Sequence, residues 1–252
     1  FYGVAIVCFD NDHVVQILPR LQKRILTYGL TEQADLQAVR IVTGGGTSEF
    51  TVRFRDREVG RVHLNRPGRH VIYNSLAAIG VALELEIDFA VIARALEGFQ
   101  GVQRRLQVKG EAGGVLVVDD YGHHPTEIRA TLDAVREGWP ERRVVVAFQP
   151  HRYTRTRALF AEFTTAFRRA DVLVLADIYA ASEQPIEGIT SESLLEASKQ
   201  HGQRQTVHIP NLVQRPEALL EVLQPGDLLL TLGAGNIVQA GEQLLAQLEG
   251  GR

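Results

Sequence analysis

From Val115 onward, short apolar runs alternate with segments of helical periodicity, and this alternation constrains the fold more than any other feature of the chain. The apolar runs predict strands at 115–119, 144–148, 172–176, 206–209 and 228–232. The segments between and after them predict helices at 126–137, 157–169, 191–201, 215–223 and 237–248. Because strands that alternate with helices are joined by right-handed crossovers, we expect a mostly parallel, doubly wound α/β sheet over residues 107–252.

Residues 1–106 follow a less regular pattern, which predicts a mixed sheet with helices. Strands are predicted at 3–9, 36–42, 49–55 and 58–64, and helices at 12–21, 72–85 and 89–99. Phe50, Val52 and Phe54 alternate with polar residues, as in a half-buried strand. The run Gly44-Gly45-Gly46 lies between strand-like segments and lacks the Lys-Ser/Thr ending of a phosphate loop, so we interpret it as a hairpin turn.

The composition excludes several classes of protein. The 252 residues carry a formal net charge of −3, which gives no basis for broad binding to nucleic acid or to an anionic membrane. Cys8 is the only cysteine, so an intrachain disulfide and a cysteine-rich zinc site are excluded. No apolar run approaches ~18 residues, so no membrane-spanning helix is expected. The chain has no methionine and begins within a predicted strand, so we expect it to be a piece of a longer protein.

The loop after the strand at 115–119 carries an unusual concentration of reactive side chains. Two carboxylates, a phenol and two imidazoles occur within Asp119-Asp120-Tyr121-Gly122-His123-His124-Pro125-Thr126-Glu127. Ligands of open α/β sheets bind at the carboxyl ends of the strands, where this loop is expected to lie. Because His123 and His124 are adjacent, they are not expected to face one ligand together, and one of them is expected to be structural.

Positive charge gathers in the loop after the strand at 144–148, which reads Phe148-Gln149-Pro150-His151-Arg152-Tyr153-Thr154-Arg155-Thr156. Arg152 and Arg155 can each present a planar fork to a carboxylate or a phosphate. The alternative interpretation is a solvated helix entrance. Two further polar loops, at 179–185 and 233–236, also follow predicted strands. Gly233 and Gly235 of the second loop match the first two glycines of a dinucleotide fingerprint, but Val238 occupies the position of the third. We therefore interpret this loop as a tight turn.

The two long segments resemble the signature segments of the alanine-adding branch of the Mur ligase family, which acts in bacterial cell-wall synthesis. Shorter matching segments at 1–3, 67–70, 101–106 and 233–237 occur in the same order, so the resemblance covers nearly the whole chain. It implies that 1–106 is part of a central ATP-binding domain without its phosphate loop. It also implies that 107–252 is a Rossmann-like C-terminal domain that binds an amino acid.

The resemblance implies an ATP-dependent ligase that adds L-alanine to UDP-N-acetylmuramate through an acyl phosphate, in the peptidoglycan synthesis of the cytoplasm. ATP and Mg²⁺ are the implied cofactors, with the main magnesium ligands upstream of this chain and none within it. The isolated chain is therefore expected to be inactive. Nucleic acid and membrane are not among the implied partners.

The resemblance also assigns roles to individual residues. Tyr121 and His123 match catalytic positions close to the alanine and to the carboxylate that reacts. Arg152 and Arg155 match arginines that bind the carboxylate of the amino acid, and His151 is expected to assist them.

A second group of matched positions concerns the nucleotide. Asp120 and Arg105 match positions near the ribose and phosphates of ATP, and Asn74 matches an asparagine that touches the base. Val71 replaces a further asparagine of that segment, and a valine cannot form the amide hydrogen bond. Recognition of the base through that position is therefore not expected.

Three alternatives fit parts of the same pattern. One is a murein peptide ligase, which joins a tripeptide to the same nucleotide but is not expected to carry the run His151-Arg152-Tyr153-Thr154-Arg155. Another is a folylpolyglutamate synthetase, a ligase of similar fold. The third is a non-catalytic Rossmann-like module that binds an anionic metabolite, which the missing phosphate loop would favour.

Overall fold

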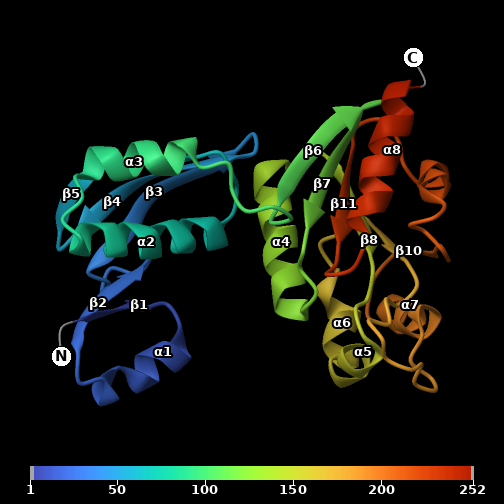
Figure 1. The fold of residues 1–252 in the computed structure, drawn as a ribbon, viewed down its shortest axis with the longest axis horizontal. Coiled ribbons are helices and arrows are strands. Elements are labelled where there is room, and N and C mark those ends of the chain that lie inside the picture. The colour runs from blue at the N-terminus through green and yellow to red at the C-terminus, as the bar shows by residue number, and fades with distance from the viewer. Residues whose placement is uncertain (1–2, 251–252) are drawn as a thin grey trace. The chain divides into compact units, whose positions relative to one another are not determined.

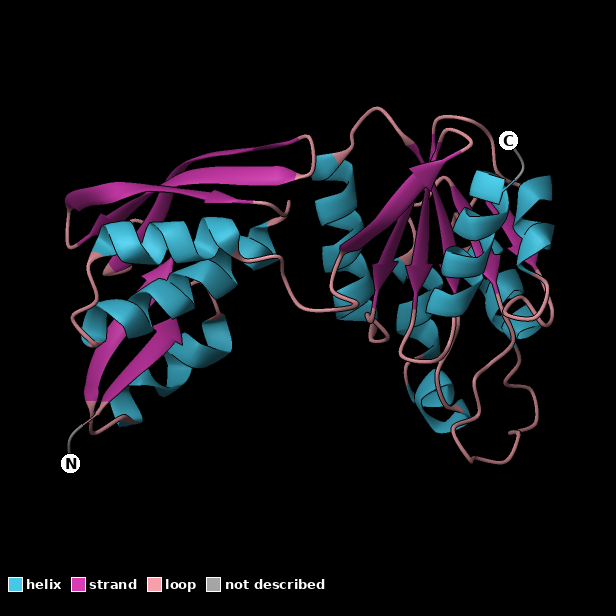
Figure 2. Ribbon diagram, turned by 45° about the horizontal axis from the view of Figure 1, so that its top comes forward, coloured by secondary structure: helices cyan, strands magenta, loops and turns pink. Residues whose placement is uncertain are grey.

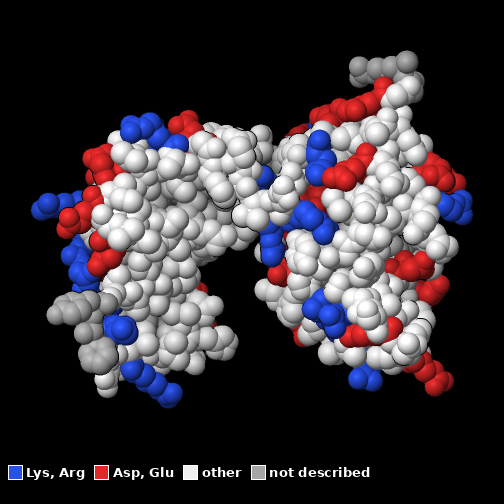
Figure 3. Space-filling model, in the orientation of Figure 1, with Lys and Arg blue, Asp and Glu red and all other residues white. Residues whose placement is uncertain are grey.

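The computed structural model describes residues 3–250, and these divide into two compact units. One unit contains the residues up to Gln100 together with Glu137–Pro140, and the other contains Gly101–Arg136 together with the residues from Glu141 onward. Both units combine strands and helices, as Figures 1 and 2 show, which confirms the predicted α/β class. Lys and Arg side chains are interspersed with Asp and Glu side chains on the face drawn in Figure 3.

The first unit is built on a five-stranded mixed sheet in the order β1-β2-β3-β4-β5. The strands are β1 (Val4–Cys8), β2 (Arg24–Gly29), β3 (Leu36–Gly44), β4 (Thr47–Phe54) and β5 (Arg57–Leu64). The first three are parallel, and β3, β4 and β5 are antiparallel. The predicted hairpin turn at Gly44-Gly45-Gly46 is confirmed, because it joins β3 to β4.

The helices of the first unit are α1 (Asp12–Ile17) with a 3-10 turn (Leu18–Arg20), α2 (Arg69–Glu84) and α3 (Phe89–Gly98). Helices α2 and α3 pack against the sheet, whereas α1 has no buried residue. Ile72, Leu76 and Ile79 of α2 are completely buried and join Phe50 and Val52 in one core. Burial of such side chains contributes about 1.5–3 kcal/mol each to folding.

Strand β2 was not predicted from the sequence. Its apolar run is limited to Ile25 and Leu26, which follow Lys23 and Arg24. The strand is nevertheless central, since it pairs with β1 on one side and β3 on the other. Its pairing partners, rather than its own periodicity, therefore hold it in the sheet.

The second unit is built on a six-stranded sheet in the order β10-β9-β8-β11-β7-β6. The strands are β6 (Gln107–Ala112), β7 (Val115–Asp120), β8 (Arg143–Phe148), β9 (Val172–Leu175), β10 (Gln205–His208) and β11 (Asp227–Leu232). All neighbours are parallel except β6 and β7. Every residue of β7, β9 and β11 is buried, as expected of parallel strands covered on both faces. The predicted, mostly parallel sheet is confirmed.

The helices of the second unit differ in places from the predicted ones. They are α4 (Pro125–Gly138), α5 (Tyr153–Ala158), α6 (Phe160–Ala166), α7 (Ser191–Gln200) and α8 (Val238–Gly250), with a 3-10 helix (Pro216–Glu221) before β11. The single helix predicted at 157–169 is wrong. The chain leaves helical geometry at Leu159, where φ is −110° and ψ is 17°, so two short helices form. Phe163 and Phe167 still pack against Phe148, with ring centroids 5.7 and 4.9 Å away.

Strand β6 also had no sequence prediction. Its sequence Gln-Val-Lys-Gly-Glu-Ala carries two charged residues, and its pairing with β7 shifts between Val108 and Gly110. Gly110 has a φ of +156°, and a β-carbon there would lie 2.7 Å from a methyl carbon of Leu245. The bulge and the close approach of α8 explain why this strand does not show a regular alternation of polar and apolar residues.

Candidate functional site

The carboxyl ends of β9, β8, β11 and β7 are neighbours in the sheet, and the loops that follow them begin side by side. The amide of Gly233 donates to the carbonyl of Asp120 at 3.1 Å, and the amide of Gln149 donates to the carbonyl of Leu232 at 3.0 Å. On the other side, His151 and Tyr179 form a parallel bridge. Four loops that are far apart in the sequence thus share one edge, as predicted for a ligand site.

Asp120 fixes the turn between β7 and α4. Its carboxylate is buried, and one oxygen accepts a hydrogen bond from the amide of Gly122 while the other accepts from the amide of Leu106, both at 2.7 Å. Burial raises the pKa of Asp120 against the opposing effect of these N–H groups. A β-carbon on Gly122 would lie 2.8 Å from the Asp120 carboxylate, so the turn requires glycine. The role of Asp120 near the ribose of ATP stays a prediction.

Glu127 holds the other end of this turn. One of its oxygens accepts hydrogen bonds from the amides of His123 at 3.0 Å and His124 at 3.2 Å. Burial alone raises the pKa of Glu127, but these amides and the nearby positive groups outweigh burial, so the pKa is lowered. His124, the residue before α4, accepts from the amide of Thr126 through Nδ1 at 3.2 Å and so satisfies one free N–H of the first turn of the helix.

Four aromatic rings form a row across three loops. The rings of Tyr121 and His123 are 5.5 Å apart in an edge-to-face arrangement, and those of His123 and His151 are 6.4 Å apart. Tyr179 continues the row, stacked on His151 at 5.3 Å with an interplanar angle of 14°. The structure therefore brings together Tyr121, His123 and His151. Tyr179 was not predicted as a site residue, although its loop was singled out as polar.

The two arginines of the β8–α5 loop have different partners. Nη1 of Arg155 lies 3.3 Å from Nδ1 of His151 and 3.4 Å from its carbonyl oxygen. Arg152 lies at the amino end of α5 with a φ of +73°, and its Nη1 is 3.5 Å from Oε1 of Glu183. Burial lowers the pKa of His151, and the positive charges of Arg155 and Arg152 lower it further, so the imidazole is neutral near pH 7.

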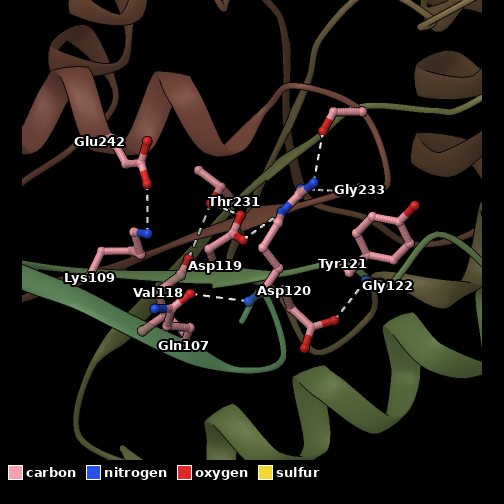
Figure 4. A network of polar contacts seen from close by, with 12 residues as sticks. Gln107, Lys109, Val118, Asp119, Asp120, Tyr121, Gly122, Thr231, Gly233 and Glu242 are labelled. Atoms are coloured by element: carbon pink, nitrogen blue, oxygen red, sulfur yellow. Dashed lines mark hydrogen bonds and ion pairs between the residues drawn. The ribbon is translucent and has the colours of Figure 1, made fainter. Parts of the chain in front are cut away.

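Beneath the row lies a buried network that sequence reasoning missed. Nε of Arg104 donates to Asp119 at 3.0 Å, and its two other nitrogens donate to the carbonyls of Gly235 at 3.0 Å and Gly233 at 2.6 Å. Asp119 also accepts from the hydroxyl of Thr231 at 2.7 Å; Figure 4 shows these two side chains pointing toward one another. Burial raises the pKa of Asp119, opposed by Thr231 and Arg104.

Arg104 and the next residue, Arg105, both lie beside the ring of Tyr121. The guanidinium carbon of Arg104 lies 5.0 Å from the centroid of the Tyr121 ring, and that of Arg105 lies 5.6 Å from it. Arg105 is half exposed and 3.8 Å from Glu127, as expected of a residue that can still reach a ligand. Its predicted contact with ATP stays a prediction. Because Arg104 and Arg105 are adjacent and identical, the sequence alone did not indicate which of them would be the more buried.

Asn74 lies in the other unit, on α2, with an exposed side chain. Its predicted contact with the base of ATP stays a prediction. Val71, which occupies the position of the missing asparagine, packs against the hydrophobic core of that unit. Next to Asn74, the hydroxyl of Tyr73 donates to Asp10 at 2.7 Å; burial and this bond raise the pKa of Tyr73.

Within residues 3–250, no group of three or more His, Cys, Asp or Glu side chains is arranged to hold a metal ion. In the same range, no helix combines the length and the apolar character needed to cross a membrane.

Comparison with known proteins places the chain in a family. A family model described as the Mur ligase middle domain matches residues 1–82, and one described as Mur ligase, glutamate ligase domain, matches residues 104–235, which is more than half of the chain. The chain therefore belongs to the Mur ligase family, and the resemblance found in its sequence is confirmed.

Individual relatives are similar along the whole chain. It is 54% identical over all its residues to the UDP-N-acetylmuramate–L-alanine ligase of Geobacter sulfurreducens and covers 54% of that protein. It is 56% identical over 97% of its length to the ligase of the same name from Desulfotalea psychrophila and covers 53% of it. The chain thus spans about half the length of the curated relatives that it matches.

A solved structure shows the same fold. The UDP-N-acetylmuramate–alanine ligase of Thermotoga maritima matches with a TM-score of 0.79 at 23% sequence identity, over 98% of this chain and 52% of that one. At this identity the match concerns the fold alone, and it agrees with the two sheets described above.

Proposed function

We propose that this chain supplies the amino-acid-binding part of an ATP-dependent ligase that joins L-alanine to UDP-N-acetylmuramate. The observation that carries the proposal is the convergence of Tyr121, His123 and His151 with Arg152 and Arg155 at one sheet edge. High identity to relatives that bear this enzyme name supports it. In this proposal, residues 1–106 belong to an ATP-binding domain and residues 107–252 form the amino-acid-binding domain.

The arginine loop is suited to the carboxylate of the amino acid. Arg152 and Arg155 both follow β8, and each presents several N–H donors in one plane. His151 is neutral, so it adds no charge of its own, and through Nδ1 it accepts a hydrogen bond from Arg155. A carboxylate between these guanidinium groups would gain charge-assisted hydrogen bonds, each contributing about 1.5–3 kcal/mol.

His123 is suited to take a proton from the amine. Its Nδ1 lies 3.1 Å from the carbonyl of Tyr121, so Nδ1 carries the hydrogen and Nε2 carries the lone pair. The α-amino group of alanine must lose a proton before it attacks an acyl group, and a neutral imidazole is the usual acceptor. Two contacts hold the His123 ring in place. They are its edge-to-face contact with Tyr121 and the hydrogen bond from the His123 amide to Glu127.

The nucleotide cofactor would supply the leaving group, since phosphorylation turns an unreactive carboxylate into an acyl phosphate. Arg105 beside Tyr121 is half exposed, and its guanidinium would supply positive charge to a phosphate. The residues from 3 to 250 do not fit a magnesium site, because no carboxylate or histidine cluster of sufficient size is present. We therefore assign no step to a metal bound by this chain.

The proposal is tested with a full-length protein that carries this chain, by measuring phosphate release that depends on L-alanine and UDP-N-acetylmuramate. Arg155→Ala is expected to raise the KM for alanine by about 10- to 150-fold, the equivalent of a lost charge-assisted hydrogen bond. Arg142→Ala is the matched control, because Arg142 pairs with Glu111 away from these loops. Absence of alanine-dependent turnover in the unmodified protein would refute the function.

A further inference from the structure

The loop at 179–185, which follows β9, is joined to the arginine loop by its backbone. The amide of Tyr179 donates to the carbonyl of Pro150, and the amide of Arg152 donates to the carbonyl of Tyr179, both at 2.8 Å. Ala181 and Ser182 then adopt left-handed backbone angles, with φ of 48° and 72°. Such angles are costly for residues other than glycine and persist where the surroundings fix them. They turn the chain back so that Glu183 faces α5.

Tyr179 supports Arg155 indirectly. Its ring stacks on the imidazole of His151, whose Nδ1 and carbonyl oxygen both lie within 3.4 Å of the Arg155 guanidinium. The ring also packs against the β11–α8 turn, since a β-carbon on Gly235 would lie only 3.1 Å from Cγ of Tyr179. The stack therefore holds the plane of the imidazole, and within that plane the contact with the Arg155 guanidinium keeps Nδ1 on the side of Arg155.

Glu183 supports the amino end of α5 directly. Its carboxylate accepts from the amide of Thr154 at 3.0 Å and from the hydroxyl of Thr154 at 2.6 Å. The same carboxylate lies 3.5 Å from Nη1 of Arg152. Its bonds to Thr154 lower the pKa of Glu183, so it stays ionised beside Arg152 at neutral pH.

We propose that the 179–185 loop sets the position of both arginines, with Tyr179 acting through His151 on Arg155 and Glu183 acting on Arg152 and Thr154. Tyr179 and Glu183 are thus positioning residues for the carboxylate of the amino-acid substrate. This inference rests on the proposed function, because it takes that carboxylate as the ligand of the arginines.

The kinetic test uses a full-length protein that carries this chain. Tyr179→Leu removes the stacked ring and is expected to raise the KM for L-alanine about 5- to 20-fold, with the KM for ATP and for UDP-N-acetylmuramate changed by less than about twofold. Tyr179→Phe keeps the ring and is the matched control, expected to stay within about twofold of the unmodified protein. An unchanged KM for alanine in Tyr179→Leu would overturn the inference.

A second readout separates positioning from loss of fold. The groups that face His151 are Arg152 before α5 and Arg155 within it, His123 from the β7–α4 turn, and Tyr179 and Glu183 from the 179–185 loop. Removal of the Tyr179 ring exposes His151 to water and raises its pKa, whereas Glu183→Gln removes a negative charge and lowers it. Titration of the ¹⁵N-labelled His151 imidazole should therefore shift in opposite directions in Tyr179→Leu and Glu183→Gln. Shifts in the same direction, or no shift, would overturn the inference.

The two proposals fail in different ways. If the unmodified full-length protein shows no alanine-dependent phosphate release, the proposed function is wrong. If it turns over alanine but Tyr179→Leu retains the alanine KM, or the His151 titration does not shift in opposite directions in Tyr179→Leu and Glu183→Gln, the function stands and the positioning role of the loop is wrong.

Discussion

The β7–α4 turn and the β8–α5 loop lie at the same sheet edge, but they are held in different ways. In the first, Asp120 at the end of β7 and Glu127 in α4 accept four backbone N–H groups, three of them from the turn between these residues. In the second, the supports come from another loop, through Glu183 and Tyr179. The turn itself is thus held mainly by carboxylates at its own two ends, whereas the arginine loop is held by side chains of a neighbouring loop.

This difference indicates that one part of the proposed site is fixed before a ligand arrives and that the other can rearrange around the ligand. A turn whose polar groups are already paired can hold His123 and Tyr121 in one geometry before a ligand arrives. The arginine loop can exchange partners, because the guanidinium of Arg152 is half exposed and its ion pair with Glu183 is long, at 3.5 Å. A carboxylate ligand could replace that contact at little cost in folding energy.

The largest effect is expected beneath the β7–α4 turn. Arg104→Ala should lower the free energy of unfolding by about 3–5 kcal/mol, because it leaves the fully buried Asp119 without its charged partner. Urea denaturation followed by circular dichroism measures the change. Arg105→Ala is the matched control, with an expected change below about 0.5 kcal/mol since Arg105 is half exposed. A loss below about 1 kcal/mol for Arg104→Ala would show that the network does not anchor this turn.

A smaller effect is expected within the turn itself. Asp120→Asn should lower the free energy of unfolding by about 1–3 kcal/mol. Each carboxylate oxygen now accepts a hydrogen bond from a backbone N–H, and the new NH₂ group would face one of these donors. Glu183→Gln, the same change in the supporting loop, should lower the urea midpoint less, since a glutamine oxygen can still accept from Thr154. Equal losses in the two variants would remove the distinction between the two regions.

A steric prediction concerns the point where the arginine loop meets its neighbours. Gly235→Ala should cost about 1–3 kcal/mol, because its β-carbon would overlap Oε1 of Gln149 and crowd the Tyr179 ring. Gly98→Ala is a fair comparison, since nothing lies within 4 Å of the added carbon. Gly98→Ala should leave the melting temperature unchanged or raise it, whereas Gly235→Ala should lower it. Equal melting temperatures of the two variants would contradict the prediction.

The smallest effect is a dependence on pH. The pKa of Glu127 is lowered from its ordinary value of 4.5 in the folded chain, so its stabilising effect is complete above that value. It is lost as the pH falls through the lower folded pKa. The difference in urea midpoint between the unmodified chain and Glu127→Gln should therefore shrink below pH 4.5. A difference that stays constant down to pH 3 would mean that Glu127 does not hold the turn as a carboxylate.

The sequence predicted the second sheet well for a physical reason. Its four central strands are buried on both faces, so runs such as the one at 144–148 are wholly apolar and easily recognised. Strands β2 and β6 are held by their neighbours and carry charged residues, so their own sequences gave no clear signal. The break at Leu159 depends on packing and could not be seen in the spacing of the phenylalanines.

The site was predictable to the extent that it depends on strand ends. Loops after β7 and β8 were expected to share an edge, and His123 and His151 do approach each other. The contribution of Tyr179 depends on β9 being the neighbour of β8, and that of Arg104 on β11 lying between β7 and β8. Strand order is a property of the whole sheet, so neither contact follows from the local sequence.

The central claim is that Arg152 and Arg155 bind the carboxylate of an amino acid. The most direct measurement follows the ¹⁵Nε resonances of labelled arginines in a full-length protein that carries this chain, in the presence of UDP-N-acetylmuramate and a non-hydrolysable ATP analogue. L-Alanine should shift the signals of Arg152 and Arg155 and leave that of Arg142 in place, whereas ethylamine, which lacks the carboxylate, should shift none of them. Saturation with alanine while both signals stay unmoved would contradict the account.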